Sequence, residues 1–289
     1  MKAIAFAPGH VSGFFEPVYR GVDAERSGSR GAGISISLGA TSHITVENAT
    51  RQKIDVCLNK KPSSAPVTTV AITQLIGHAP LNITVDTTLD LPVSQGFGMS
   101  AAGALSATLA LAKILEMPSE CALKASHYAE VNQKTGLGDV VASSFGGIEI
   151  RREPGLPPWG MIEHIPGQYD VVLCVVGKKI ETKHVLSDPK KRADIASYGR
   201  YCTKKILDKP SIEALFSLSQ LFARKTGLVD PKVLEAIHIA NHHGMASMCM
   251  LGNSVFAIGD TNMLCTVLSP YGKVWVCSVD ECGARVLKE

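Results

Sequence analysis

The chain has 289 residues, of which 45% are hydrophobic and 19% are charged, and its formal net charge at pH 7 is +3. This length and composition allow one large or two small domains, and the small, scattered charge does not favour nucleic acid as a partner. No apolar run approaches the roughly 20 residues that cross a bilayer. The N-terminal apolar run is broken by Pro8, Gly9 and His10, too early for a signal peptide. We therefore expect a cytoplasmic protein without a membrane or nucleic-acid partner.

The cysteines agree with a reducing compartment. None of the eight forms a Cys-x-x-Cys pair, and several lie within apolar runs such as 171–176. This pattern is typical of buried, reduced thiols rather than of a metal cluster or a disulfide framework.

Alternating and apolar segments predict the elements of the first half of the chain. In chain order, strands are expected at 1–7, 33–38, 43–47, 54–58, 81–91 and 148–151, and helices at 67–76, 100–115 and 119–133. The period-two patterns at 33–38 and 43–47 predict a hairpin or a meander. Segment 67–76 fits a helix or a strand, and the strand expected at 81–91 favours the helix.

A Pro- and Gly-rich stretch at 153–160 (EPGLPPWG) predicts the internal boundary. Beyond it we expect strands at 170–176, 254–258 and 273–279, and helices at 190–207, 212–226 and 231–242. Asp230 as N-cap and Pro231 in the first helical position mark the start of the last of these helices. The mixture is α+β in two lobes, 1–152 and 153–289.

The stretch 91–105 (LPVSQGFGMSAAGAL) joins a strand to an Ala-rich helix through a glycine turn. The first N–H groups of a helix lack partners within the helix, and its dipole favours an anion there. Gly96 and Gly98 add backbone freedom and let a ligand approach. The turn therefore predicts a phosphate site, although an ordinary connection capped by Ser100 fits the same residues.

Three segments, taken together, resemble the GHMP kinase superfamily. They are 7–10 (APGH), the turn 92–102, and the loop 135–147 (TGLGDVVASSFGG). With the further pattern at 28–33 (GSRGAG), the chain is most similar to the archaeal pantoate kinase branch. The resemblance covers the N-terminal lobe and is weak in the C-terminal lobe. It implies a two-lobed fold, with a mixed α/β N-terminal lobe carrying the phosphate loop and a ferredoxin-like α/β C-terminal lobe.

The resemblance also implies that ATP binds at the glycine turn. The residues that it assigns to the nucleotide are Pro92, Gly96, Phe97, Gly98, Met99, Ser100, Ala101 and Ala102. Phe97 and Met99 depart from the Leu and Ser of the family, so the backbone has to replace the missing hydroxyl. A third glycine motif is reduced to 244–254, where we expect no contact with ATP.

The family pattern assigns Ser100 and Glu130 to Mg²⁺ and Asp139 to the general base. For Glu130 the alternative is a solvated carboxylate on a helix. For Asp139 it is a helix N-cap.

His10 stands where mevalonate kinases carry a lysine. We expect it to donate to the reacting oxygen of the substrate, and a structural histidine is the alternative. Arg30, in the loop 28–31, is the cation predicted to bind a substrate carboxylate, because its planar fork suits two hydrogen bonds. An arginine of a surface loop is the alternative.

The resulting hypothesis is an ATP- and Mg²⁺-dependent kinase that phosphorylates the hydroxyl of a small hydroxy acid, with pantoate as the favoured acceptor. Homoserine, shikimate and mevalonate are alternative acceptors. A non-catalytic relative that binds a nucleotide or metabolite, and an interaction module whose glycine turn is only a turn, are the alternatives outside the enzymes. Apolar strands such as 273–279 are compatible with a homodimer.

Overall fold

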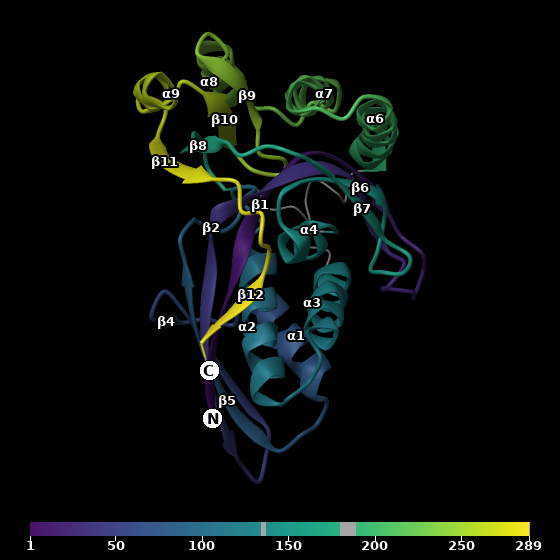
Figure 1. Ribbon diagram of the computed structural model, residues 1–289, viewed down its shortest axis with the longest axis vertical. Coiled ribbons are helices and arrows are strands. Elements are labelled where there is room, and N and C mark those ends of the chain that lie inside the picture. Colours follow the sequence, from purple (N-terminus) through teal and green to yellow (C-terminus); the bar gives the residue numbers. More distant parts are fainter. Residues whose placement is uncertain (134–136, 180–188, 289) are drawn as a thin grey trace.

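The computed structural model describes residues 1–133, 137–179 and 189–288, so Thr135 and Gly136 of the predicted loop lie outside the described residues. Figure 1 shows two sheets, each covered by helices, stacked along the long axis of the molecule. This mixture of helices and sheets agrees with the fold class expected from the sequence.

The first sheet is built around two long antiparallel strands, β1 and β2, and its main path runs β12-β1-β2-β5-β3-β4. β6 pairs with β2 beside this path, and β7 pairs with β6. The strands are β1 (Lys2–Val18), β2 (Gly28–Asn48), β3 (Lys53–Leu58), β4 (Lys61–Pro62), β5 (Leu81–Leu89), β6 (Ile148–Glu153), β7 (Met161–Ile165) and β12 (Arg285–Lys288).

The hairpin or meander predicted within 33–47 is wrong, because this segment belongs to the single strand β2. β2 pairs with β1 along nearly all of its length, and on its other side first with β6 and then with β5. A strand that finds partners on both sides stays extended through Gly39 and Ala40, where the local pattern predicts an interruption.

Helices cover one face of this sheet: α1 (Pro66–Ile76), α2 (Met99–Ile114), α3 (Ser119–Gln133) and α4 (Asp139–Phe145). The helix prediction for 67–76 is therefore confirmed. α2 is buried from Ala101 to Ala112, because its small side chains let the sheet and the neighbouring helices approach it from all sides.

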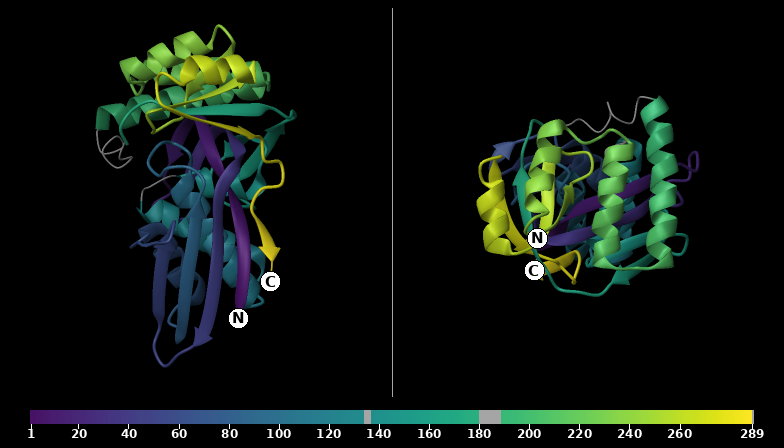
Figure 2. Two further views of the ribbon diagram at one scale, coloured as in Figure 1. Left: turned by 90° about the vertical axis from the view of Figure 1, so that its left-hand side faces the viewer. Right: turned by 90° about the horizontal axis from the view of Figure 1, so that it is seen from above.

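The second sheet has the order β11-β8-β10-β9 and is antiparallel throughout. Its strands are β8 (Asp170–Val175), β9 (Gly244–Met248), β10 (Ser254–Gly259) and β11 (Lys273–Ser278). The helices are α6 (Pro189–Asp208), α7 (Ile212–Lys225), α8 (Pro231–Ala240) and α9 (Thr261–Leu268). Seen from above, these helices form one layer (Figure 2). Asp230 caps α8 by accepting the N–H of Lys232, as the sequence predicted.

The chain passes between the sheets at two places. β7 pairs with β6 in the first sheet, so the change to the second sheet comes between Ile165 and Asp170 and not at the predicted boundary of 153–160. The C-terminal β12 then returns to pair with β1, which brings the two ends of the chain side by side (Figures 1 and 2). The short elements β4, β7, β9, α9 and β12 were not predicted from the sequence.

The thiols of Cys174, Cys202, Cys249 and Cys277 are buried, as expected, whereas Cys282 is exposed. Burial raises the pKa of Cys174 to about 11 and that of Cys249 to about 12, so these thiols stay protonated at neutral pH. Among the described residues, no helix combines the length and the apolar character that a membrane span requires.

Candidate active site

The glycine turn is the loop between β5 and α2, and its backbone has the predicted unusual conformation. Gly96 and Gly98 have φ values of 77° and 65°, in the left-handed region that favours glycine. Gly98 is the N-cap of α2 and offers no side chain for capping. Ser100 is therefore not the cap that one reading of the sequence proposed; it lies in the first turn with its side chain exposed.

The N-terminus of α2 carries a run of free backbone donors. Among the described residues, no backbone acceptor takes the N–H groups of Gly96 through Ala101. The N–H of Ala102 donates to the carbonyl of Gly98 within the helix. Ala102 therefore offers no free backbone N–H for the phosphate contact that was predicted for it. Free N–H groups together with the helix dipole suit this turn to hold phosphate oxygens.

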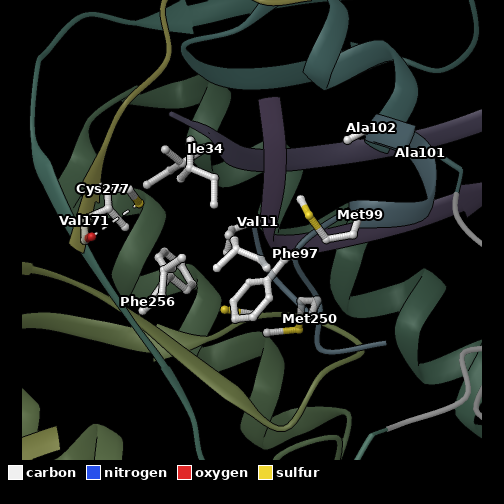
Figure 3. Packing of buried hydrophobic residues seen from close by; sticks show 14 of the residues in the cluster. Val11, Ile34, Phe97, Met99, Ala101, Ala102, Val171, Met250, Phe256 and Cys277 are labelled. Carbon is white, nitrogen blue, oxygen red and sulfur yellow. Dashed lines mark hydrogen bonds between the residues drawn. The ribbon is translucent and has the colours of Figure 1, made fainter. Parts of the chain in front are cut away.

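Phe97 and Met99, which depart from the family pattern, point into the core. Their side chains are only 1% and 3% exposed. Figure 3 shows them among buried side chains that include Val11, Met250 and Phe256. Of these two residues, only the backbone is available to a nucleotide. The loss of a hydroxyl at position 99 is thus accompanied by a hydrophobic anchor for the turn.

The turn packs against residues 249–254, between β9 and the start of β10, which belong to the reduced third motif expected from the sequence. A Cβ on Gly96 would lie 2.8 Å from the carbonyl oxygen of Met250, and one on Gly252 would lie 2.1 Å from the backbone of Gln95. The hydroxyl of Ser254 donates to the carbonyl of Gln95 at 2.5 Å. These glycines allow two backbones to pack closely, so the segment supports the turn from behind.

The three predicted motifs meet at His10. Its backbone N–H donates to the carbonyl of Phe97 at 3.0 Å. Its Nδ1 lies 2.8 Å from Oδ1 of Asp139, the first residue of α4. The N-cap of α4 is Gly138, so Asp139 does not cap the helix by its side chain, which is 29% exposed. Asp139 is thus oriented by His10 and partly exposed, so a ligand in the site can reach its carboxylate.

Sequence reasoning missed two residues of this cluster, Glu149 and Arg151, both in β6. Oε1 of Glu149 lies 3.0 Å from Nε2 of His10 and also accepts Nη1 of Arg151. Nη2 of Arg151 donates to the hydroxyl of Ser12 at 3.3 Å. Both side chains are buried, at 0% and 2% exposure. The available signal was a Glu and an Arg alternating within an apolar strand directly after Gly146 and Gly147.

His10 is positively charged at neutral pH. Its complete burial would lower its pKa, but the charge of Glu149 and the hydrogen bonds to Asp139 and Glu149 outweigh burial and raise the pKa to about 9. The imidazolium donates from both nitrogens, to Asp139 and to Glu149.

Glu130 is not the solvated helix carboxylate that the sequence left open. It is 1% exposed, and neither carboxylate oxygen has a hydrogen bond of normal geometry to a described residue. Burial, with a smaller contribution from the charge of Asp139, raises the pKa of Glu130 to about 8. A buried carboxylate with two free oxygens fits a hard cation such as Mg²⁺.

The described residues do not form a complete metal cage, since no group of three or more His, Cys, Asp or Glu side chains among them is arranged to hold a metal ion.

Arg30 lies in strand β2 and not in the loop predicted at 28–31, and its partners among the described residues lie outside this cluster. Its guanidinium pairs with Glu16 at 3.4 Å and with Glu153 at 2.8 Å. A substrate carboxylate would compete with both partners. His127, also not predicted, is buried with Nε2 2.9 Å from the carbonyls of both Ala24 and Ser27. Burial lowers the pKa of His127, which is therefore neutral, and its Nδ1 has no partner among the described residues.

Comparisons with known proteins agree with this geometry. The GHMP kinases N terminal domain matches residues 67–147, from α1 to the end of α4. The chain is 31% identical to a pantoate kinase of Methanospirillum hungatei over 99% of this chain and 96% of that protein. It is 33% identical to a pantoate kinase of Thermococcus kodakarensis over 88% of this chain and 86% of that protein.

Among solved structures, a phosphotransferase related to the CoA biosynthesis pathway superposes with a TM-score of 0.89 at 29% identity. The match covers 100% of this chain and 99% of the other. Sequence and structure both match over nearly the full length, and the matched region contains the free helix N-terminus and the Asp139–His10 pair. The chain therefore belongs to the GHMP kinase family, in the branch of the pantoate kinases.

Proposed function

We propose that this protein transfers the γ-phosphoryl group of ATP to the hydroxyl of pantoate, which yields 4-phosphopantoate for coenzyme A synthesis. The observation that carries the proposal is the position of Asp139, a partly exposed carboxylate held by the side chain of His10. The backbone N–H of His10 in turn donates to the carbonyl of Phe97 in the glycine turn. The names of the near full-length relatives support the choice of acceptor.

The proposed reaction uses the groups of the site in distinct roles. The free N–H groups of the turn bind the phosphates of ATP at the N-terminus of α2. Asp139 accepts the proton of the acceptor hydroxyl, whose oxygen forms a bond to the γ-phosphorus while the bond to the β-phosphate oxygen breaks. The imidazolium of His10 orients Asp139 and places positive charge beside the reacting oxygens.

Mg²⁺ would be held by the hydroxyl of Ser100 and the carboxylate of Glu130, and when bound it supplies charge neutralisation on the phosphates. The unpartnered oxygens of Glu130 and the exposed side chain of Ser100 support this assignment. Arg151, with its Nε unpartnered among the described residues, joins Arg30 as a candidate cation for the carboxylate of the acceptor. Homodimer formation and a cytoplasmic location stay predictions.

A panel of acceptors tests the proposal. The purified protein is supplied with Mg²⁺–ATP and with pantoate, homoserine, mevalonate or shikimate in turn, and ADP formation is measured. We expect kcat/KM for pantoate to exceed that for every other acceptor. Preferred turnover of homoserine or mevalonate would contradict the choice of pantoate but would leave the kinase chemistry intact.

A further inference from the structure

Glu149 is a buried charged residue for which the proposed chemistry has no direct role. It lies in β6, where it pairs in register with Gly33, and Arg151 pairs with Gly31. Residues two apart on a strand share one face of the sheet, so the carboxylate and the guanidinium project together toward β1.

The glycines of β2 create the space for this arrangement. A Cβ on Gly33 would lie 2.5 Å from Nε2 of His10, and one on Gly31 would lie 3.0 Å from Nη2 of Arg151. A side chain at either position would displace the imidazole of His10 or the guanidinium of Arg151. The 28–33 motif of the sequence thus contributes the room in which His10, Glu149 and Arg151 meet.

A single oxygen holds both cations in place. Oε1 of Glu149 accepts Nε2 of His10 and Nη1 of Arg151, and these two nitrogens lie only 3.4 Å apart. Two positive groups at that distance repel each other unless an anion lies between them. Without the charge of Glu149, His10 would lose its proton or Arg151 would move away, because buried unpaired charge is strongly unfavourable.

We propose that Glu149 is a positioning residue for phosphoryl transfer: it holds the His10 imidazolium and the Arg151 guanidinium in one fixed arrangement beside Asp139. The carboxylate does not touch the reacting atoms. It acts through His10, whose Nδ1 donates to the base, and through Arg151, whose other nitrogens face Ser12 and the Gly138 turn. The inference rests on the proposed kinase function.

The charged groups that surround His10 come from three elements. Asp139 belongs to α4, Glu149 and Arg151 to β6, and Glu130 to α3, whose carboxylate interacts with the charge of His10. Of these groups, Glu149 is fully buried and contacts both cations, so its substitution changes the protonation of His10 without removing the base.

The test is Glu149→Gln, an isosteric change that keeps an acceptor oxygen and removes the charge. In the unliganded full chain, the side chain of His10 is titrated by NMR, with His10→Gln to assign its signal. We expect the wild-type imidazolium to persist to about pH 9 and its midpoint in Glu149→Gln to fall by about one pH unit or more. We also expect kcat to fall by about 100-fold, with the KM for ATP nearly unchanged.

Glu163→Gln is the matched control, since Glu163 lies on the adjacent β7 and pairs with Arg152 at the surface. It should leave the His10 titration and kcat as in the wild type. An unchanged midpoint together with an unchanged kcat in Glu149→Gln would overturn the proposal. So would equal losses in kcat and ATP affinity, which indicate general damage.

If Glu149→Gln does not fold, Glu149→Asp, which keeps the charge but shortens its reach, is compared in its place and should lower kcat while His10 stays charged. A neutral wild-type His10 at pH 7 overturns the inference without any variant. The titration needs no acceptor, and kcat is measured with whichever acceptor the panel selects. Failure of pantoate as the acceptor is therefore distinguishable from failure of the role of Glu149.

Discussion

Asp139 and His10 are 129 positions apart in the chain, yet Oδ1 of the aspartate accepts Nδ1 of the imidazolium at 2.8 Å. This bond joins the first motif of the sequence to the third, and the backbone of His10 joins both to the phosphate turn. The pair places an oriented carboxylate at the N-terminus of α4, where we propose that it serves as the general base.

Asp139→Asn is expected to lower kcat by about 10²- to 10⁴-fold, because the amide cannot accept the hydroxyl proton. The amide oxygen can still accept from His10, so the affinity for ATP should change little. Steady-state kinetics and nucleotide titration measure the two quantities. Asp230→Asn is the control, since asparagine also caps helices well. Full turnover in Asp139→Asn would assign the base to another group.

Ser100→Ala tests the predicted magnesium ligand. The side chain is exposed and makes no hydrogen bond to a described residue, so its loss should leave the free energy of unfolding within about 0.5 kcal/mol of the wild type. We expect a higher Mg²⁺ concentration for half-maximal activity and a lower kcat. Ser217→Ala, on the exposed face of α7, should affect neither. An unaltered Mg²⁺ dependence in Ser100→Ala would remove this residue from the metal site.

Glu130→Gln should change how stability depends on pH. The pKa of Glu130 is raised in the folded protein to about 8 from 4.5, so the folded state holds a proton that the unfolded state releases. Without Mg²⁺, the wild type therefore loses stability as pH rises from 4.5 to 8, by roughly 3 to 5 kcal/mol from this group. In Glu130→Gln this loss should be absent, as measured by urea unfolding at several pH values.

Mg²⁺ favours the charged carboxylate, so its addition should stabilise the wild type more at pH 8 than at pH 6. Glu130→Gln should not show this difference. Glu120→Gln, an exposed change in the first turn of the same helix, is the control and should follow the wild type. If the stability of Glu130→Gln and of the wild type depended on pH in the same way, burial would not destabilise the charged carboxylate of Glu130.

Met99→Ser reinstates the residue of the family pattern. The Cε of Met99 lies only 2.7 Å from where a Cβ on Gly9 would stand, and the side chain is buried. The change leaves a cavity and a buried hydroxyl, so we expect a loss of about 2 to 5 kcal/mol in the free energy of unfolding and no gain in ATP affinity. Met263→Ser, at an exposed position of α9, should cost far less. Tighter ATP binding by Met99→Ser would mean that position 99 faces the phosphates.

Local patterns predicted the long helices and the strands β5, β8, β10 and β11 well, because their periodicity and caps depend on neighbouring residues. The strand predicted at 1–7 continues to Val18, however. α3 runs over 119–133 as predicted, and Asp230 caps α8. The prediction failed where pairing overrode local pattern: β2 continues through Gly39 and Ala40 because β1 and β5 hold it on both sides. Short edge strands such as β12 carry too few residues for a periodic signal.

By itself, the sequence determined that a strand, a glycine turn and an Ala-rich helix present free N–H groups, since glycine conformation and helix termini are local properties. It also supplied Asp139, His10 and Glu130 as candidates. Only the tertiary structure decided their charges and their partners. The carboxylates of Glu149 and Asp139 keep His10 cationic despite its burial, and burial favours a protonated Glu130. The meeting of β1, β2 and β6 brings Glu149 and Arg151 to His10. These effects depend on distance in space and on exclusion of water, which no spacing along the chain records.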